Sequence, residues 1–293
     1  MPELPEVETV RRGLAPALEG RRIMAADIRR PDLRWPFPDG FGGRLEGRRI
    51  ESVGRRAKFL TIGLDDGATW IAHLGMTGRF QVDAPDGLHD PGAFYHEAER
   101  LTAHDHVVLD LDDGARLTYN DPRRFGAMDL AEHGLLDAHP WLASLGIEPT
   151  GNGLSAPALA DVMAGSRTPL KAALLDQRRV AGLGNIYVCE ALNRARLSPF
   201  REARTLARKD GSAGVRAERL TGEIRAVLAE AIAAGGSTLR NFRAADGSTG
   251  AMQQRFRAYD REGESCLNAG CRGVIARAVQ SGRSTFHCPV CQR

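Results

Sequence analysis

The chain has 293 residues, of which 42% are hydrophobic, and its 40 basic and 37 acidic residues give a formal net charge of +3. This length is typical of one large domain or of two smaller ones. No apolar run approaches membrane-spanning length and no secretory leader precedes the fold, so the sequence argues against membrane and secreted proteins. The small positive charge is compatible with nucleic-acid binding but does not demonstrate it.

The chain begins Met1-Pro2-Glu3. A small second residue permits removal of the methionine, which leaves the secondary amine of Pro2 as the N-terminus. Because α-amino groups titrate about two units or more below a lysine side chain, this amine can attack an aldehyde-like carbon and form an iminium. Glu3 stands beside it as a proton donor. The alternative is a stiff leader in which Glu3, Glu6 and Glu8 favour a helix N-terminus.

The first half of the sequence predicts one helix followed by short β-strands. The helix covers residues 4–20, because apolar residues recur there at helical spacing, and Pro16 should kink or interrupt its last turn. Asp-Asp-Gly turns at 65–67 and 112–114 predict hairpins, and repeated short strands suggest an antiparallel sandwich or barrel. Residues 83–103 are polar and are predicted to form a long exposed loop. The predicted strands are residues 49–64, 68–74, 107–111 and 115–119.

Two short motifs in this β-rich part have side chains suited to contact with stacked bases. Met76 lies between Gly75 and Gly78, so at an exposed loop tip it is suited to act as an apolar wedge; the alternative is an ordinary core methionine. Arg123 and Phe125 place a planar cation and an aromatic ring two residues apart.

Glycine, proline, asparagine and serine accumulate at residues 145–157, which we interpret as a domain boundary. Helical patterning follows. Gly182-Leu183-Gly184-Asn185 precedes a predicted helix whose first amides would be free to bind an anion. A nucleotide-binding loop is disfavoured, because no strand precedes it and the third glycine is absent.

Four cysteines near the C-terminus, Cys266, Cys271, Cys288 and Cys291, form two pairs joined by a segment suited to a β-hairpin. Four thiolates at such spacings suit one tetrahedral zinc, with free thiols or a redox site as the alternatives. From residue 255 onward seven arginines and three acids give a local charge of +4, which fits a segment that faces phosphates.

These motifs occur together and in order, and in that combination the sequence resembles the formamidopyrimidine-DNA glycosylases. The resemblance rests on Pro2 to Leu14, His73 to Gly78, Asp121 to Gly126, Gly182 to Asn185 and the four cysteines. It implies an α+β fold, with an N-terminal antiparallel β-sandwich and flanking helices, then a helix-two-turn-helix domain with a zinc-finger β-hairpin. We expect three domains: 1–147, 148–257 and 258–293. Leu4 favours this family over the sister endonuclease VIII group, which usually has glycine there.

The resemblance also implies a role for each matching residue. Pro2 would be the nucleophile and Glu3 the acid/base, while Lys58 and Arg283 would contact phosphate and assist the β- and δ-elimination steps. For Lys58, a solvated lysine at a strand end is the alternative. Three side chains would fill the space left by the extruded nucleotide, namely Met76, Arg123 and Phe125. Four more would contact the DNA backbone, namely His73, His104, Arg167 and Asn185.

The predicted activity is therefore that of a monomeric, bifunctional glycosylase and lyase acting on oxidised purines in damaged double-stranded DNA, in the bacterial cytoplasm. One structural zinc is expected, and no redox cofactor. Two departures from the family pattern are visible: four residues, rather than two, separate Cys266 from Cys271, and the lid-like segment 246–254 has Ala251-Met252 where an aromatic residue is common. The alternatives are an endonuclease VIII-like enzyme for oxidised pyrimidines and a non-catalytic zinc-finger protein that binds nucleic acid.

Overall fold

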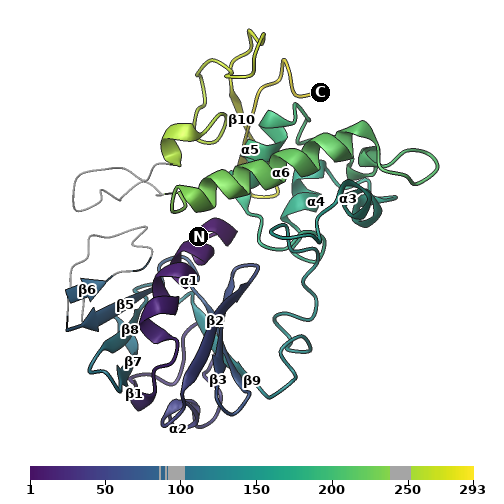
Figure 1. Cartoon of the computed structure of the whole chain (residues 1–293). Coiled ribbons are helices and arrows are strands. Elements are labelled where there is room, and N and C mark those ends of the chain that lie inside the picture. The colour runs from purple at the N-terminus through teal and green to yellow at the C-terminus, as the bar shows by residue number, and fades with distance from the viewer. Residues whose placement is uncertain (86, 90, 92–102, 238–251) are drawn as a thin grey trace. The chain divides into compact units, whose positions relative to one another are not determined.

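The computed structural model of the chain describes every residue except 86, 90, 92–102 and 238–251. The chain forms two units, one of Met1–Ala143 with Ala234–Ala251 and the other of Ser144–Ala233 with Met252–Arg293 (Figure 1). Each is described by itself below. Among the described residues, no helix combines the length and apolar character that crossing a membrane requires. The division into three domains stays a prediction.

The described residues of the first unit form two antiparallel sheets and two helices. The larger sheet has the strand order β1-β7-β8-β5-β6 and the smaller one β2-β3-β4-β9. The elements are α1 (Leu4–Leu18), β1 (Ile23–Ile28), α2 (Phe41–Leu45), β2 (Ile50–Arg56), β3 (Phe59–Leu64), β4 (Thr69–His73), β5 (Arg79–Ala84), β6 (Gly87–His89), β7 (Asp105–Leu111), β8 (Arg116–Asn120) and β9 (Ala127–Ala131).

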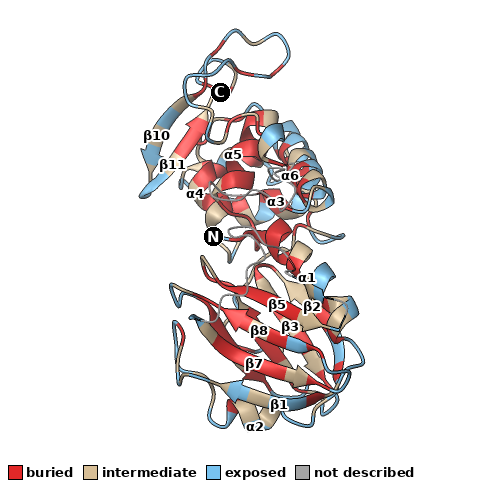
Figure 2. Ribbon diagram, turned by 90° about the vertical axis from the view of Figure 1, so that its left-hand side faces the viewer, coloured by how far each residue is buried: buried red, intermediate tan, exposed pale blue. Residues whose placement is uncertain are grey.

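One apolar core joins both sheets to α1, as a sandwich requires. Inward residues alternate along β3, where Leu60, Ile62 and Leu64 are buried (Figure 2). Trp70 of the smaller sheet meets Phe80 of the larger one edge to face, with ring centroids 5.9 Å apart. The predicted antiparallel sandwich is confirmed, with two corrections in its details.

The sequence predicts one strand over residues 49–64, but these residues form β2 and β3, which are antiparallel neighbours. The turn between them contains Ala57, whose φ of 53° is a conformation that alanine rarely adopts, so no turn residue marks it. The predicted loop at residues 83–103 is also interrupted, because Gly87–His89 form β6 against β5. Residues 92–102 of that segment lie outside the described residues. The first helix continues through Pro16 and ends at Leu18.

The second unit is mainly helical and ends in a β-hairpin. Its longest helix, α6, buries one apolar face that includes Leu220, Ile224 and Leu228. The hairpin β10–β11 lies between the two pairs of cysteines, as predicted. The elements are α3 (Ala156–Met163), α4 (Leu170–Leu175), α5 (Asn185–Arg194), the 3-10 turn η1 (Ala203–Leu206), α6 (Val215–Ala233), the 3-10 turn η2 (Gln253–Arg255), β10 (Ala276–Gln280) and β11 (Arg283–His287).

Candidate functional site

The N-terminal dipeptide is held against the first turn of α1. Pro2 and Glu3 are buried, and Glu3 is the residue at which the helix starts. The Glu3 backbone N–H donates to Glu6 Oε2 at 2.9 Å, and the other oxygen of Glu6 accepts from the Ser237 N–H at 2.7 Å and from its hydroxyl at 2.8 Å. Glu3 and Glu6 therefore both cap the start of α1, which is the helix-start role that the sequence offered as an alternative, and the Glu3 carboxylate also acts to raise the pKa of the terminal amine.

Several charged groups surround the terminal amine. Burial lowers the pKa of the Met1 amine below its ordinary value of 8.0; Glu3 and Glu6 oppose that change, and Lys58 and Arg123 add to it. Lys58 lies in the β2–β3 turn and only 7% of its surface is exposed, so it is not a solvated lysine at a strand end. Removing Met1 moves the amine to the buried Pro2. A buried amine that resists protonation is the form that a carbonyl-like carbon needs as a nucleophile.

His73 ends β4, directly opposite Phe59 of β3. Burial, together with the positive charges of Lys58 and Arg34, lowers its pKa to about 4. The imidazole is therefore neutral at pH 7. Because the Gly75 N–H donates to its Nδ1 at 3.1 Å, the proton lies on Nε2, which can donate a hydrogen bond outward.

The loops that carry Met76 and Phe125 pack against each other. Gly75 has a φ of 64°, and a Cβ added there would lie 2.3 Å from the backbone carbon of Phe125, so only glycine permits this approach. Met76 is half-buried, while Arg123 and Phe125 are exposed. The Arg123 guanidinium lies 4.7 Å from the centre of the Phe125 ring. The three side chains expected to act together therefore come from two adjoining loops.

Asp121 organises the second of these loops. Its fully buried carboxylate accepts from the Thr77 hydroxyl and, at 2.8 Å, from the Gly126 N–H. Within the described part of the chain it forms no ion pair with Arg123, so the guanidinium stays available. His104 is exposed, and its carbonyl accepts from the Asp121 N–H at 3.1 Å, which attaches the expected DNA-contacting segment to the same loop.

In the second unit, α5 begins at Asn185, as the glycine pair predicted. The Gln177 side chain braces the glycine turn, accepting from the Gly182 N–H at 2.8 Å and donating to the Leu183 carbonyl at 2.9 Å. The side-chain amide of Asn185 donates from Nδ2 to the Ser284 carbonyl at 3.0 Å. Ser284 directly follows the exposed Arg283, which begins β11. Arg167 is exposed three residues before α4.

Two buried charged residues that the sequence did not single out as functional also hold the C-terminal segment. Lys171 of α4 donates to the Ser284 carbonyl at 2.9 Å and to the Thr285 hydroxyl at 2.7 Å. Glu190 of α5 accepts three backbone N–H groups of residues 257–259 at 2.8–2.9 Å. The one signal for Lys171 in the sequence is that lysine is rare: the chain has only Lys58, Lys171 and Lys209.

The four cysteines converge on one point. Their sulfur atoms lie within 4.8 Å of one another, with Cys266 to Cys291 at 3.7 Å and Cys271 to Cys288 at 3.6 Å. A tetrahedral zinc with Zn–S bonds of about 2.3 Å separates its sulfurs by about 3.8 Å. The arrangement therefore fits one metal ion bound by four thiolates.

The longer first cysteine loop is compatible with this geometry. Asn268, within that loop, donates from Nδ2 to the Cys291 sulfur at 3.3 Å and to the Asn193 carbonyl at 2.9 Å. The additional residues thus attach the metal centre to α5. The fifth cysteine, Cys189, is buried in α5, as expected for a packed thiol. The lid-like residues 246–251 lie outside the described residues.

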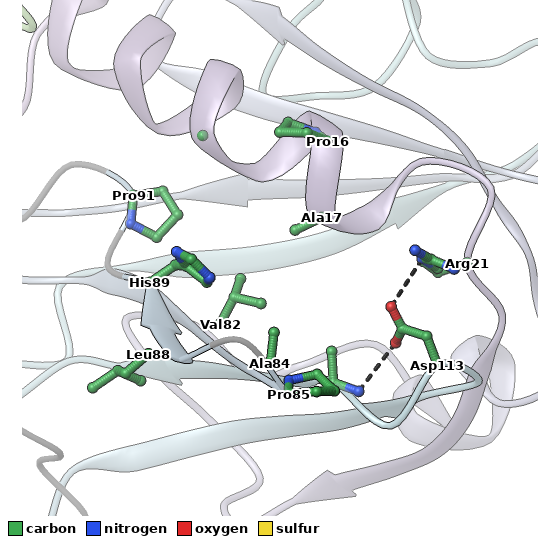
Figure 3. A pocket seen from close by; sticks show the side chains of 12 residues that line it. Pro16, Ala17, Arg21, Val82, Ala84, Pro85, Leu88, His89, Pro91 and Asp113 are labelled. Atoms are coloured by element: carbon green, nitrogen blue, oxygen red, sulfur yellow. Dashed lines mark hydrogen bonds and ion pairs between the residues drawn. The ribbon is translucent and has the colours of Figure 1, made fainter.

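A separate cavity of about 730 Å³ lies between the end of α1, the strands β5 and β6, and the turn between β7 and β8. It is mainly apolar, and at one side Arg21 pairs with Asp113 at 3.0 Å (Figure 3). None of the predicted site residues lines it.

Comparison with known proteins agrees with this geometry. Residues 1–128 match the formamidopyrimidine-DNA glycosylase N-terminal domain, and residues 145–243 match the H2TH domain of the same enzymes. The chain is 58% identical over 296 residues to the formamidopyrimidine-DNA glycosylase of Brucella ovis and 57% identical to that of Mesorhizobium japonicum, with both chains covered in full.

Solved structures give the same result. The chain resembles the MutM (Fpg) protein of Thermus thermophilus with a TM-score of 0.80 and 41% identity, covering 99% of this chain and 98% of that one. It also resembles the Lactococcus lactis Fpg in complex with DNA that contains an abasic site, with a TM-score of 0.82, 32% identity and coverage of 99% of each chain. The chain belongs to the formamidopyrimidine-DNA glycosylase family.

Proposed function

We propose that this chain excises oxidised purines, 8-oxoguanine and formamidopyrimidines, from duplex DNA and then cuts the strand at the resulting abasic site. The observation that carries the proposal is the buried Pro2-Glu3 dipeptide beside the buried Lys58. The relatives are named for the glycosylase activity, and the similar Lactococcus lactis structure contains DNA with an abasic site.

In the proposed reaction the Pro2 nitrogen attacks C1′ of the damaged nucleotide and displaces the base. Glu3 supplies and accepts protons at the sugar. The iminium makes the 2′ proton acidic, so that β-elimination and then δ-elimination release the two DNA ends, with Lys58 and Arg283 beside the phosphates that leave. Extrusion of the nucleotide costs a few kcal/mol, which Met76 and the phosphate contacts must offset.

We further propose that the backbone contacts come from His73, His104, Arg167 and Asn185, and that the four cysteines hold one structural zinc. Bound zinc would cross-link the ends of the hairpin segment and stabilise it. The neutral His73 suits a phosphate contact through its Nε2–H. We also propose three domains, 1–147, 148–257 and 258–293, action as a monomer, and a location in the bacterial cytoplasm.

The nucleophile is tested by borohydride trapping on 8-oxoguanine duplex, followed by peptide mapping of the adduct. We expect loss of Met1 by N-terminal mass measurement, an adduct at Pro2, and slow trapping by Pro2→Gly. Arg116→Gln changes an exposed arginine at the start of β8. It is the surface control and should trap normally. An adduct at Lys58 would contradict the assignment. Faster excision of oxidised pyrimidines than of purines would instead favour an endonuclease VIII-like activity.

A further inference from the structure

Arg34 and Trp35 form an exposed arm on the first unit, and its backbone is fixed. The Arg34 N–H donates to the Gly126 carbonyl and the Leu33 N–H to the Trp35 carbonyl, both at 3.0 Å. Gly126 directly follows Phe125, so the arm adjoins the loop that carries Arg123. Trp35 is nevertheless 45% exposed, which is unusual for the largest apolar side chain.

A row of aromatic rings links this arm to His73. Trp35 lies 5.3 Å from Trp141, Trp141 lies 6.1 Å from Phe59, and Phe59 lies 5.0 Å from His73, all between ring centroids. His139 packs edge-on against Trp141 at 5.3 Å. The row gives Trp35 a rigid support, so its outer face is held in place rather than free to turn inward.

Among the residues that the structure describes, no carboxylate pairs with the charge on the arm. The neighbouring Arg30 and Arg124 both lie within 4.0 Å of the Asp32 carboxylate, at 3.0 and 4.0 Å. Arg34 has no such carboxylate partner among the described residues, and its guanidinium instead lies 4.8 Å over the Trp35 ring. The positive charges of Arg34 and Lys58 both lower the pKa of His73. A guanidinium that no carboxylate neutralises, held on an aromatic face, suits a phosphate, with the ring against the adjoining sugar.

We propose that Arg34 and Trp35 form a further DNA contact, in which Arg34 binds a backbone phosphate and Trp35 packs against the neighbouring deoxyribose. This inference rests on the proposed function, because it extends the DNA-binding face beyond His73. The contact is to the backbone, so it carries no sequence preference of its own.

The test measures affinity for an uncleavable abasic-analogue duplex as a function of salt. Losing one phosphate contact lowers the slope of log K against log salt by about 0.9, which corresponds to roughly five-fold weaker binding at about 0.15 M salt. We expect this loss in Arg34→Gln and not in Arg116→Gln, whose arginine pairs with Asp110 at 2.7 Å. Excision at saturating enzyme should be unchanged in the control Arg116→Gln, whose side chain has no part in the proposed contact.

Tryptophan fluorescence provides a second readout. Trp70 is fully buried and Trp35 is 45% exposed, so we expect the larger part of a change on DNA binding to come from Trp35. Trp35→Phe keeps an aromatic face and should retain affinity while losing most of that change. Equal salt slopes in the Arg34 and Arg116 variants, or an undiminished signal in Trp35→Phe, would overturn the inference. If the wild type bound DNA through Arg34 but excised nothing, the proposed function alone would fail.

Discussion

Arg123 should read the base that is left unpaired opposite the lesion, and it should prefer cytosine. A guanidinium has donors only. The Watson–Crick edge of cytosine places two acceptors, N3 and O2, side by side, whereas adenine flanks its N1 acceptor with an amino donor. Arg123→Ala removes the donors and should remove the preference.

The contacts of Asp121 and Phe125 set the expected size of the cytosine preference. The Asp121 carboxylate is engaged by Thr77 and Gly126 rather than by Arg123, so no ion pair between the two must be broken to bind the base. The full value of a bidentate contact is then available, about 1–3 kcal/mol or roughly 5- to 150-fold in discrimination. The Arg123 guanidinium lies 4.7 Å from the centre of the Phe125 ring, which orients it. An exposed cation–π contact of this kind contributes about 0.5–1 kcal/mol. Phe125→Ala should therefore lower the preference by only about two- to five-fold.

The assay compares single-turnover excision of 8-oxoguanine opposite cytosine and opposite adenine, in wild type, Arg123→Ala and Phe125→Ala. Arg116→Gln controls for the loss of one surface charge. The reasoning is refuted if the cytosine preference survives intact in Arg123→Ala, because another residue must then read the opposite base.

Three other predictions concern Cys288, Lys171 and Glu8. Cys288→Ser should reduce bound metal below half an equivalent and weaken DNA binding; metal analysis that finds a full equivalent would contradict the four-thiolate site. Lys171→Met removes two hydrogen bonds to the hairpin and should lower stability by about 1.5–3 kcal/mol, so an unchanged Tm would count against it. Burial alone would raise the pKa of Glu8, but hydrogen bonds from three arginines lower it to about 2. Its contribution to stability is thus present above its ordinary pKa of 4.5 and is lost as the pH falls towards 2. Glu8→Gln should therefore lose less stability than the wild type between about pH 5 and about pH 3 in denaturant unfolding; an equal loss in both proteins would contradict this, since the other carboxylates with lowered pKa values, such as Asp176 and Glu230, titrate in both.

Local chemistry explains which parts of the fold were predictable. The hairpin at residues 65–67 was visible because Gly67 supplies the positive φ that its turn needs, at 82°. The β2–β3 turn was not, because Ala57 adopts a similar conformation without any residue that favours it. Strand β6 is three residues long and exists only through its pairing with β5, which no local pattern reveals.

The residues of the candidate site also differ in whether a local sequence pattern marks them or only tertiary packing reveals them. Pro2, Glu3 and the cysteines have a chemistry that their type and spacing display, so the sequence alone is enough to propose them, and the structure brings the four cysteines together. Lys171 meets its partners 113 and 114 residues further along the chain, and such a contact depends on tertiary packing alone. The arm of Arg34 and Trp35 is invisible in the sequence for a related reason: its supporting ring, Trp141, comes from a distant part of the chain.

The bond between Glu6 and Ser237 has a consequence for biosynthesis. The two residues are 231 positions apart, yet they belong to the same unit. A ribosome therefore exposes Glu6, and the proposed nucleophile Pro2, long before the serine that fixes one oxygen of this carboxylate has been translated. A nascent or prematurely terminated chain lacks that contact. If the proposed reaction uses Pro2, the strand-cutting site becomes fully ordered only near the end of synthesis, and we expect an N-terminal fragment to be a poor nuclease.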